Sequence, residues 1–213
     1  MTGYRIASLA VMVEEIGEIE VANLLSGFSC PLNPDVENFL RHDAVVFAKQ
    51  GIAATHLVFT SYKDQVVLIG YFTLASKTIA VKSSLKISTT LRRRVCKFGT
   101  YYPEIKQTLI SAPLIAQLGK NFSNGYNKLI TGDELLQMAC NRIMKTQQIV
   151  GGRIAYLECE RKQKLLDFYE RNGFRQFSTR PLDQDEKRVM SGTELVQLIT
   201  YFNANSRAQA DSA

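Results

Sequence analysis

One amphipathic helix in the second half of the chain, with an apolar run on each side of it, constrains the fold most. From Thr131 onward apolar side chains recur at helical spacing for about two and a half turns. Gly151 and Gly152 follow the helix and are expected to end it. The apolar runs 113–122 and 153–159 are typical of buried strands. A helix in this position predicts a parallel strand pair joined by a crossover helix.

The remaining segments predict a sheet flanked by helices. Asn33 and Pro34 form a helix-start signal, and Gly51 is expected to end that helix. Strands of a hairpin are expected on either side of the turn at 62–64. The segment 194–202 fits a strand or a helix, and we favour a strand. The other expected elements are strands at 4–9, 55–60, 66–74 and 174–178 and a short helix at 162–172. The predicted fold class is α/β (α+β).

Composition narrows the class of protein. The chain has 213 residues, of which 46% are hydrophobic and 22% charged, and this is ordinary for one folded domain. We expect one domain over 1–202 and a disordered tail at 203–213. The net charge of +6 favours polyanionic partners such as RNA or phosphorylated cofactors.

The cysteine and histidine residues indicate no metal site. None of the four cysteines forms a CxxC pair, and the chain has only two histidines, so no zinc spacing exists. We therefore expect reduced thiols, a cytoplasmic location and no bound metal. The apolar stretch 6–13 is too short to span a membrane. His56, in the middle of a predicted strand, is expected to serve packing.

Two short segments carry candidate chemistry. Thr131 and Glu134 fit a capping box, which places a helix N-terminus after the loop that ends at Ile130. Such a helix N-terminus can bind a pyrophosphate, and Gly132, which has no side chain, would let the backbone approach the phosphates closely. Many crossover helices begin in this way and bind nothing. The second segment is the run Phe-Tyr-Glu-Arg-Asn-Gly-Phe at 168–174, where Tyr169 alone could equally be a core aromatic.

Read together, the two segments resemble the GNAT superfamily of N-acetyltransferases. Residues 114–120, the loop to Gly132 and the helix start at 133–136 look like the family's acetyl-coenzyme A motif. Residues 157–159 and 165–174 look like its next strand and its FYxxxGF signature, and 67–74 resembles the central strand before them. Residues 28–30 with 36–40 resemble the branch that includes the acetyltransferase toxins of toxin–antitoxin pairs. The resemblance covers roughly 28–180 and implies a mixed, centrally splayed sheet.

The sequence departs from the family pattern in the phosphate loop. Asn127 stands where Arg or Gln is usual, and Ile130 stands where the first glycine is usual. Lys162 replaces an Asn that often opens the helix before the signature tyrosine. Lys128 could supply a compensating positive charge to a phosphate.

The resemblance also implies roles for particular residues. A splayed strand would hold the pantetheine arm of acetyl-CoA, and a backbone N–H near Leu118 would stabilise the oxyanion. Tyr169 would protonate the leaving thiolate. Glu158 is a candidate base, and equally a structural carboxylate at the strand end. The expected cofactor-binding residues are Ala116, Gln117, Leu118, Gly119, Lys120, Asn127, Lys128, Leu129, Ile130, Thr131 and Gly132.

The sequence does not identify the molecule that accepts the acetyl group. The main interpretation is transfer of an acetyl group to a primary amine of unknown identity, in a small molecule, a peptide or an aminoacyl-tRNA. The sharper alternative is a toxin that acetylates aminoacyl-tRNA; growth arrest on expression or an adjacent ribbon-helix-helix antitoxin would favour it. An apparent insertion at 77–108 holds Arg92, Arg93, Arg94, Lys97 and Lys106, which could contact RNA or could be an ordinary polar surface.

Two further expectations concern partners. A non-catalytic domain that binds coenzyme A or a protein is the alternative from another class; Ile130 favours it and Tyr169 argues against it. An exposed terminal strand could pair two copies into a homodimer. Tyr71 and Phe72 alternate along a strand, so one of them could line the acceptor pocket.

Overall fold

The computed structural model describes residues 3–184, 186–188 and 192–202. The predicted tail at 203–213 lies outside this part. The chain divides into two compact units: unit 1 is Met1–Ala75 with Ala116–Ala139, and unit 2 is Ser76–Ile115 with Cys140–Ala213. Strand β3 (Gln65–Lys82), strand β5 (Gln107–Lys120) and helix α6 (Gly132–Val150) each pass from one unit into the other. The prediction of a single domain stays a prediction.

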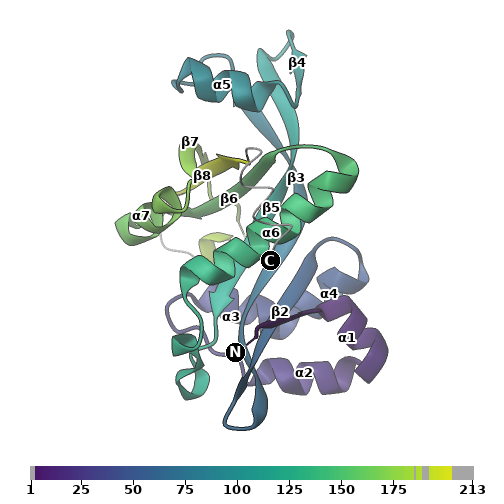
Figure 1. Cartoon of the computed structure of the whole chain (residues 1–213). Coiled ribbons are helices and arrows are strands. Elements are labelled where there is room, and N and C mark those ends of the chain that lie inside the picture. The colour runs from purple at the N-terminus through teal and green to yellow at the C-terminus, as the bar shows by residue number, and fades with distance from the viewer. Residues whose placement is uncertain (1–2, 185, 189–191, 203–213) are drawn as a thin grey trace. The chain divides into compact units, whose positions relative to one another are not determined.

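The described strands form one mixed eight-stranded sheet, as predicted (Figure 1). Its order is β1-β2-β3-β5-β6-β8-β7, and β4 (Thr100–Tyr102) pairs with β5. Strands β5 and β6 are parallel, with Leu114 opposite Tyr156, and the chain between them contains α6. The predicted crossover unit is therefore confirmed. The other strands are β1 (Arg5–Ser8), β2 (Ala54–Tyr62), β6 (Ile154–Glu160), β7 (Arg175–Pro181) and β8 (Glu194–Tyr201).

The last strand of the sheet is not an edge. The segment after Glu194 is a strand rather than a helix, and it pairs antiparallel with β6 on one side and with β7 on the other. The C-terminal strand β8 therefore offers no free side for pairing two copies. The two edges of the sheet are β1, the N-terminal strand, and β7, so pairing of two copies through an exposed terminal strand stays a prediction.

Unit 1 packs short helices against β1 and β2. Asn33 caps α3 (Pro34–Asn38), as its sequence predicts: its side-chain oxygen accepts a hydrogen bond from the Asp35 N–H at 3.2 Å. The helix then continues through a π-helical turn, η1 (Phe39–Asp43), into α4 (Ala44–Lys49). Helices α1 (Leu9–Ile16) and α2 (Glu18–Ser26) complete this layer, and α1 and α4 contact β2 (Figure 1).

The predicted hairpin in unit 1 is confirmed, with a longer second strand. Lys63 and Asp64 both have positive φ, the backbone that a tight two-residue hairpin turn needs. His56 lies against the ring of Phe72, with centroids 5.0 Å apart. Tyr71 and Phe72 are both fully buried, so the expectation that one of them lines an acceptor pocket is not met.

Unit 2 contains the segment 77–108, which is folded rather than irregular. It holds the end of β3, helix α5 (Thr89–Cys96), β4 and the start of β5. Figure 1 shows α5 and β4 at the ends of β3 and β5. The unit also contains α7 (Gln163–Arg171) and the short turn η3 (Glu186–Arg188). In the described chain, no helix is both long and apolar enough to cross a membrane.

Candidate functional site

Two glycines let neighbouring strands approach closely in unit 1. A Cβ on Gly70 would lie 2.9 Å from the carbonyl oxygen of Gly119, which is closer than real Cβ atoms come to a backbone atom. A Cβ on Gly119 would collide with Val36 and press on the Tyr71 ring. Gly119 is among the predicted cofactor-binding residues, and its missing side chain is explained by this packing. Any role toward a cofactor must therefore use its backbone.

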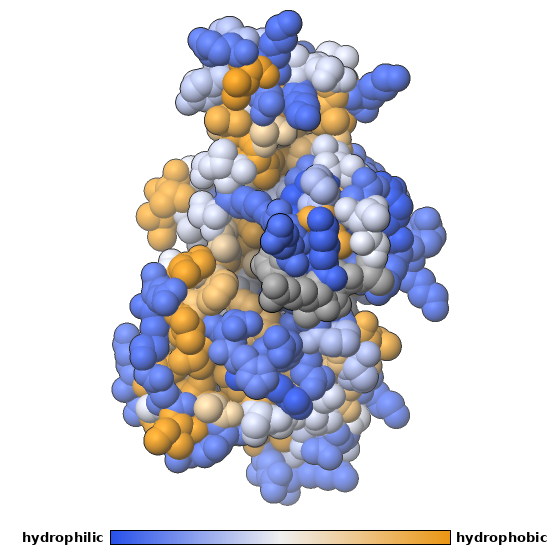
Figure 2. All heavy atoms as spheres, turned by 180° about the vertical axis from the view of Figure 1, so that it is seen from behind, coloured by the Kyte–Doolittle hydropathy of each residue, from blue (hydrophilic) through white to orange (hydrophobic). Residues whose placement is uncertain are grey.

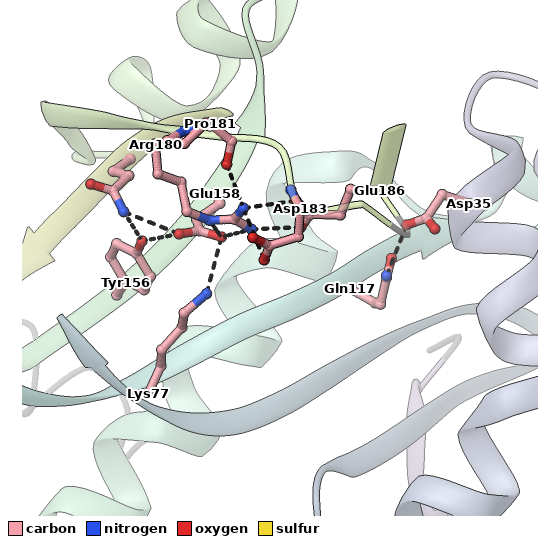
Figure 3. A network of polar contacts seen from close by, with 10 residues as sticks. Asp35, Lys77, Gln117, Tyr156, Glu158, Arg180, Pro181, Asp183 and Glu186 are labelled. Carbon is pink, nitrogen blue, oxygen red and sulfur yellow. Dashed lines mark hydrogen bonds and ion pairs between the residues drawn. The ribbon is translucent and has the colours of Figure 1, made fainter. Parts of the chain in front are cut away.

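The end of β5 is tied to the helical layer of unit 1. Gln117 donates a hydrogen bond to Asp35 at 3.1 Å, and Asp35 belongs to the first turn of α3 (Figure 3). The buried Tyr71 hydroxyl donates to the Val36 carbonyl at 2.6 Å. Ala116 is exposed, and Leu118 is half-buried. The residues predicted to hold the pantetheine arm thus lie on a strand whose neighbours fix it in place.

Asn121 organises the turn that follows β5, and the sequence analysis missed it. Its side-chain NH₂ donates to the Leu68 carbonyl at 2.8 Å. Its side-chain oxygen accepts from the N–H groups of Ser29 at 3.1 Å and Ser123 at 3.0 Å. The side chain is buried and satisfied, which is how a core tolerates such a group. Asn121 lies inside the predicted strand 113–122, and its only local signal is a polar residue near the end of that run.

Lys120 closes the predicted phosphate loop. Its ammonium donates to the carbonyls of Asn127 at 2.9 Å and Ile130 at 3.2 Å. The loop includes the 3₁₀ turn η2 (Ser123–Lys128), in which Asn124 and Gly125 have positive φ. Lys128 is exposed at the end of that turn. Lys120 therefore holds the loop shape, whereas the Lys128 side chain is exposed, and its role toward a phosphate stays a prediction.

The capping box at the start of α6 forms as predicted. The Thr131 hydroxyl accepts from the Glu134 N–H at 3.1 Å, and the Glu134 carboxylate accepts from the Thr131 N–H at 2.8 Å. The hydrogen bond from the Thr131 backbone, aided by its hydroxyl, lowers the pKa of Glu134. Gly132 is the first residue of the helix and lies outside this reciprocal pair. Two carboxylates in the first turn offset the positive helix end, so an anion here would also need lysine charge.

Two other predicted loop residues have structural contacts. Ile130 is buried, so the side chain at the usual glycine position belongs to the core. The Leu129 carbonyl accepts from the Tyr4 hydroxyl at 3.2 Å. The same hydroxyl donates to the Glu134 carboxylate at 3.0 Å. These contacts join Tyr4, which directly precedes β1, to the start of α6. The Ile130 side chain is therefore accommodated by packing within unit 1.

Tyr169 lies near the end of α7, in unit 2. Its ring packs against Phe168, with centroids 4.9 Å apart, and against Phe174 at 6.0 Å. Burial raises the pKa of its phenol well above the ordinary value, and the nearby Cys159 thiol adds to the rise. Gly173 has φ +85° and ends the helix, as predicted from the sequence. Tyr169 is thus a protonated hydrogen-bond donor throughout the neutral pH range.

Glu158 lies at the centre of a buried ion network in unit 2 (Figure 3). Arg180 donates to its carboxylate from Nε at 2.8 Å, and Lys77 approaches it at 3.3 Å. Gln197 donates to it at 3.2 Å, and the Tyr156 hydroxyl donates a short hydrogen bond. Its side chain is 8% exposed. Burial opposes ionisation, but these donors outweigh burial and lower the pKa of Glu158 to about 2.

This network favours the structural interpretation of Glu158 over the catalytic one. A carboxylate with a pKa of about 2 is a weak proton acceptor at neutral pH. Arg180 continues the network to Glu186, with a hydrogen bond of 2.7 Å, and so ties β7 and η3 to β6. Neither Arg180 nor Lys77 was predicted to contact Glu158, because the three residues are far apart in sequence.

The free cysteines show no sign of nucleophilic chemistry. Burial, reinforced by the charge of Glu160, raises the pKa of Cys159 to about 11, so it is a thiol at neutral pH. Burial also raises the pKa of Cys140 to about 12. Among the described residues, no group of three or more His, Cys, Asp or Glu side chains is arranged to hold a metal ion.

The fold, rather than the sequence, connects this chain to known proteins. No protein-family model matches the sequence, and no curated protein matches it. A solved Tyr-to-Phe mutant of KacT matches over 100% of this chain and 99% of its own, with 14% identity and a TM-score of 0.60. AtaT complexed with acetyl-methionyl-tRNAfMet matches over 91% and 94%, with 15% identity and a TM-score of 0.58.

The chain has the fold of the GNAT acetyltransferase toxins. The match runs over the full length, and it confirms the predicted resemblance at the level of fold. A further match is an AtaT mutant toxin bound to the C-terminus of the antitoxin AtaR and to acetyl-CoA, with 14% identity, a TM-score of 0.57, and coverage of 98% and 96%. In the toxin fold, the predicted strand and loop residues belong to unit 1, whereas Tyr169 and Glu158 belong to unit 2.

Proposed function

We propose that this chain is an acetyl-CoA-dependent N-acetyltransferase that acetylates the amino group of an aminoacyl-tRNA. The observation that carries the proposal is the match, over nine-tenths of both chains, to AtaT in complex with acetyl-methionyl-tRNAfMet. This favours the aminoacyl-tRNA alternative over a small-molecule or peptide acceptor. It supports a toxin role rather than a housekeeping role for the proposed activity.

The residues of unit 1 fit acetyl-CoA as the acetyl donor. The backbone of β5 from Ala116 to Lys120 would hold the pantetheine arm, and the N–H near Leu118 would polarise the thioester carbonyl. The pyrophosphate would lie against the loop from Asn127 to Gly132. Lys120 keeps that loop closed. The two carboxylates in the first turn of α6 would repel a pyrophosphate, and the exposed Lys128 would supply the positive charge that offsets them. When bound, acetyl-CoA supplies an activated acyl group.

Tyr169 is the proposed proton donor to the leaving thiolate. A phenol whose pKa is raised by burial remains protonated at neutral pH, and it can donate a hydrogen bond as negative charge develops on sulfur. The packing of its ring on Phe168 and Phe174 restricts its rotation. Tyr169 lies within a complete FYxxxGF signature at 168–174, and this argues against a non-catalytic interpretation.

Glu158 is assigned a positioning role instead of the base role. Its carboxylate is held by four donors and is a weak base, so the proton of the attacking amine must leave by another path. An α-amino group in an ester of tRNA has an ordinary pKa near that of a chain terminus, about 7.7–8.0 or lower. A large fraction is therefore already neutral near pH 7.5, and water can accept its proton.

The test is a transfer assay with purified protein, acetyl-CoA and a charged tRNA pool. After ribonuclease digestion, mass spectrometry of the terminal aminoacyl-adenosine would show a gain of one acetyl group. A methionyl-tRNA and several elongator aminoacyl-tRNAs, assayed separately, would define the amino acid. Growth arrest on expression, abolished by Tyr169→Phe, would support the toxin role. Acetylation of small amines or peptides with charged tRNA left unmodified would contradict the proposal.

A further inference from the structure

We propose that the segment 77–108 forms a separate surface that binds the phosphate backbone of the tRNA body. The proposal deepens the proposed function and takes the identity of the RNA from it. The segment consists of the end of β3, α5, β4 and the start of β5, all within unit 2. Three features of the segment support the proposal: its net charge, the lack of ion-pair partners for most of its basic side chains, and the folded scaffold that carries them.

The segment carries the whole positive charge of the chain. It contains eight basic residues and one acidic residue, Glu104, so its formal charge is +7. The rest of the chain has eighteen basic and nineteen acidic residues, which leaves it at −1 against a total of +6. A domain that is neutral apart from one strongly basic segment has a localised polyanion footprint. The basic residues are Lys77, Lys82, Lys86, Arg92, Arg93, Arg94, Lys97 and Lys106.

Almost none of these charges is neutralised within the protein. In the part of the chain that the structure describes, Lys77 is the only one of the eight in an ion pair, with Glu158. Arg92 donates to the Lys82 and Leu85 carbonyls, which fixes the loop before α5 but leaves the charge uncompensated. Lys82, Lys86 and Arg93 are exposed. Clustered like charges create a positive potential that attracts polyanions, so these side chains are available to an external counter-charge.

The charges stand on a folded scaffold. Ser88 caps α5 by accepting a hydrogen bond from the Leu91 N–H at 3.2 Å. Val95 of α5 is buried in the same hydrophobic cluster as Ile79, Val81 and Ile110 of the flanking strands. A core of this kind holds the basic side chains in a constant pattern, and a preformed pattern binds with a smaller loss of conformational entropy.

Exposed aromatic side chains lie in the same segment. Tyr101 is 53% exposed and Tyr102 is 43% exposed, both on β4. Arg94 and Lys97 lie over the ring of Tyr201, each 5.7 Å from its centroid. Figure 2 shows mainly hydrophilic side chains over the α5 and β4 end of unit 2, with apolar ones between them. Basic side chains mixed with exposed aromatics suit RNA, whose unpaired bases stack on such rings.

The buried face of α5 argues against a membrane as the partner. A helix that binds a bilayer needs a free apolar face to insert below the headgroups. The apolar residues of α5 and its flanks, including Leu91, Val95 and Phe98, instead pack into the unit 2 core. The surface of the segment keeps exposed basic side chains and two tyrosines, with Ile105 as its one large exposed aliphatic side chain among the described residues, which fits a hydrated polyanion better than a bilayer.

The experiment measures binding and chemistry separately on the full chain. The test variant is Lys82→Gln/Lys86→Gln/Arg93→Gln, which removes three exposed charges. The matched control is Lys145→Gln/Lys164→Gln/Arg175→Gln, which removes the same residue types from exposed positions of unit 2 outside the segment. A charge-retaining variant, Lys82→Arg/Lys86→Arg/Arg93→Lys, tests for structural damage. Binding of labelled, deacylated tRNA is followed by anisotropy over a salt series, and acetylation is followed with methionyl-adenosine, which lacks the RNA body.

We expect the test variant to bind tRNA at least about tenfold more weakly than the parent chain does. The logarithm of the binding constant falls linearly with the logarithm of the salt concentration. The magnitude of that slope should decrease by about two to three, which is about one for each lost phosphate contact. The control and charge-retaining variants should bind within about twofold of the parent chain, which is less than the loss of one phosphate contact would give. All variants should acetylate methionyl-adenosine equally.

Other outcomes separate this inference from the proposed function. Unchanged tRNA affinity in the test variant overturns the inference even if charged tRNA is acetylated. Loss of tRNA binding supports the inference, whereas absence of acetylation in every variant, the parent included, overturns the proposed function. Binding to phosphatidylglycerol vesicles that depends on the three residues, with no tRNA binding, overturns the inference in favour of a lipid surface.

Discussion

Unit 2 contains two groups of charged residues that differ in almost every physical respect. Around Glu158 the charges are of opposite sign: its buried carboxylate is joined by hydrogen bonds to the partly exposed side chains of Arg180 and of Lys77, the residue at which the two groups meet. In the segment 77–108 most of the charges are exposed, eight of the nine are positive, and seven of the eight basic residues form no ion pair among the described residues. The first group is satisfied by the protein itself, whereas the second is not. We infer that the first holds the fold together and the second is available to a ligand.

The largest effect is expected from breaking the buried network. Replacing Arg180 by Met leaves the carboxylates of Glu158 and Glu186 without their shared partner. The loss of one partner from a buried ion pair costs about 3–5 kcal/mol. Urea denaturation would measure this fall in the free energy of unfolding.

Arg161→Met is the matched control for that change. Arg161 forms an exposed pair with Glu194, so its loss should cost less than about 1 kcal/mol. Equal costs for the two variants would remove the distinction between buried and exposed charge that the comparison depends on.

The pH dependence of stability should show the same network. The pKa of Glu158 is about 2 in the folded chain, below its ordinary value of 4.5. Its stabilisation is therefore complete above about pH 4.5 and is lost as the pH falls toward 2, for a total of about 3 kcal/mol. Glu158→Gln should reduce this acid loss by that amount, as measured by urea denaturation at a series of pH values. A variant whose acid profile equals that of the parent would show that Glu158 titrates normally.

Tyr169→Phe should show whether the half-buried Tyr169 takes part in the chemistry or only supports the fold. Loss of a positioned proton donor typically costs about 100-fold or more in turnover. Acetyl-CoA affinity should change little, because the phenol interacts with developing charge. Steady-state kinetics and titration with coenzyme A would measure the two quantities.

Glu158→Gln serves as the reference for Tyr169→Phe. In a positioning role it should affect stability more than turnover, because the carboxylate does not take the proton of the amine. A turnover loss as large as that of Tyr169→Phe, with folding intact, would restore Glu158 as the base.

The smallest effect concerns the two helix caps. Thr131→Ala and Ser88→Ala should each lower the free energy of unfolding by about 1 kcal/mol, because each removes a side-chain acceptor at an N-cap. Only Thr131→Ala should also weaken acetyl-CoA binding, since Thr131 lies in the predicted phosphate loop. Calorimetric titration of both variants with acetyl-CoA would measure this difference. Equal acetyl-CoA affinities of the two variants would count against a role of the loop in phosphate binding.

Local signals predicted much of the fold. The Asn33 cap, the capping box at Thr131 and the end of α7 at Gly173 depend on hydrogen bonds and backbone angles within a few residues, so their residues were sufficient. The mixed sheet followed from the order of these elements. The π-helical turn at 39–43 and the length of β3 depend on packing, and neither has a short-range signal.

The candidate site was predicted less completely, for the same reason. Motif spacing located Tyr169 and the loop before α6. It gave no account of Asn121, whose partners Ser29 and Leu68 are more than fifty residues away. Glu158 was proposed as a base because it follows an apolar strand run, but Arg180 and Lys77 decide its charge and come from distant strands.

Calorimetric titration of the purified chain with acetyl-CoA tests the central claim most directly, with desulfo-coenzyme A as the control for thiol-dependent effects. The account predicts saturable binding with a dissociation constant on the order of micromolar, about −8 kcal/mol, despite Asn127 and Ile130 at the usual positions of other residues. Lys128→Gln should weaken that binding. No detectable binding would contradict the account, because the phosphate loop would then be a structural turn and Tyr169 would have no thiolate to protonate.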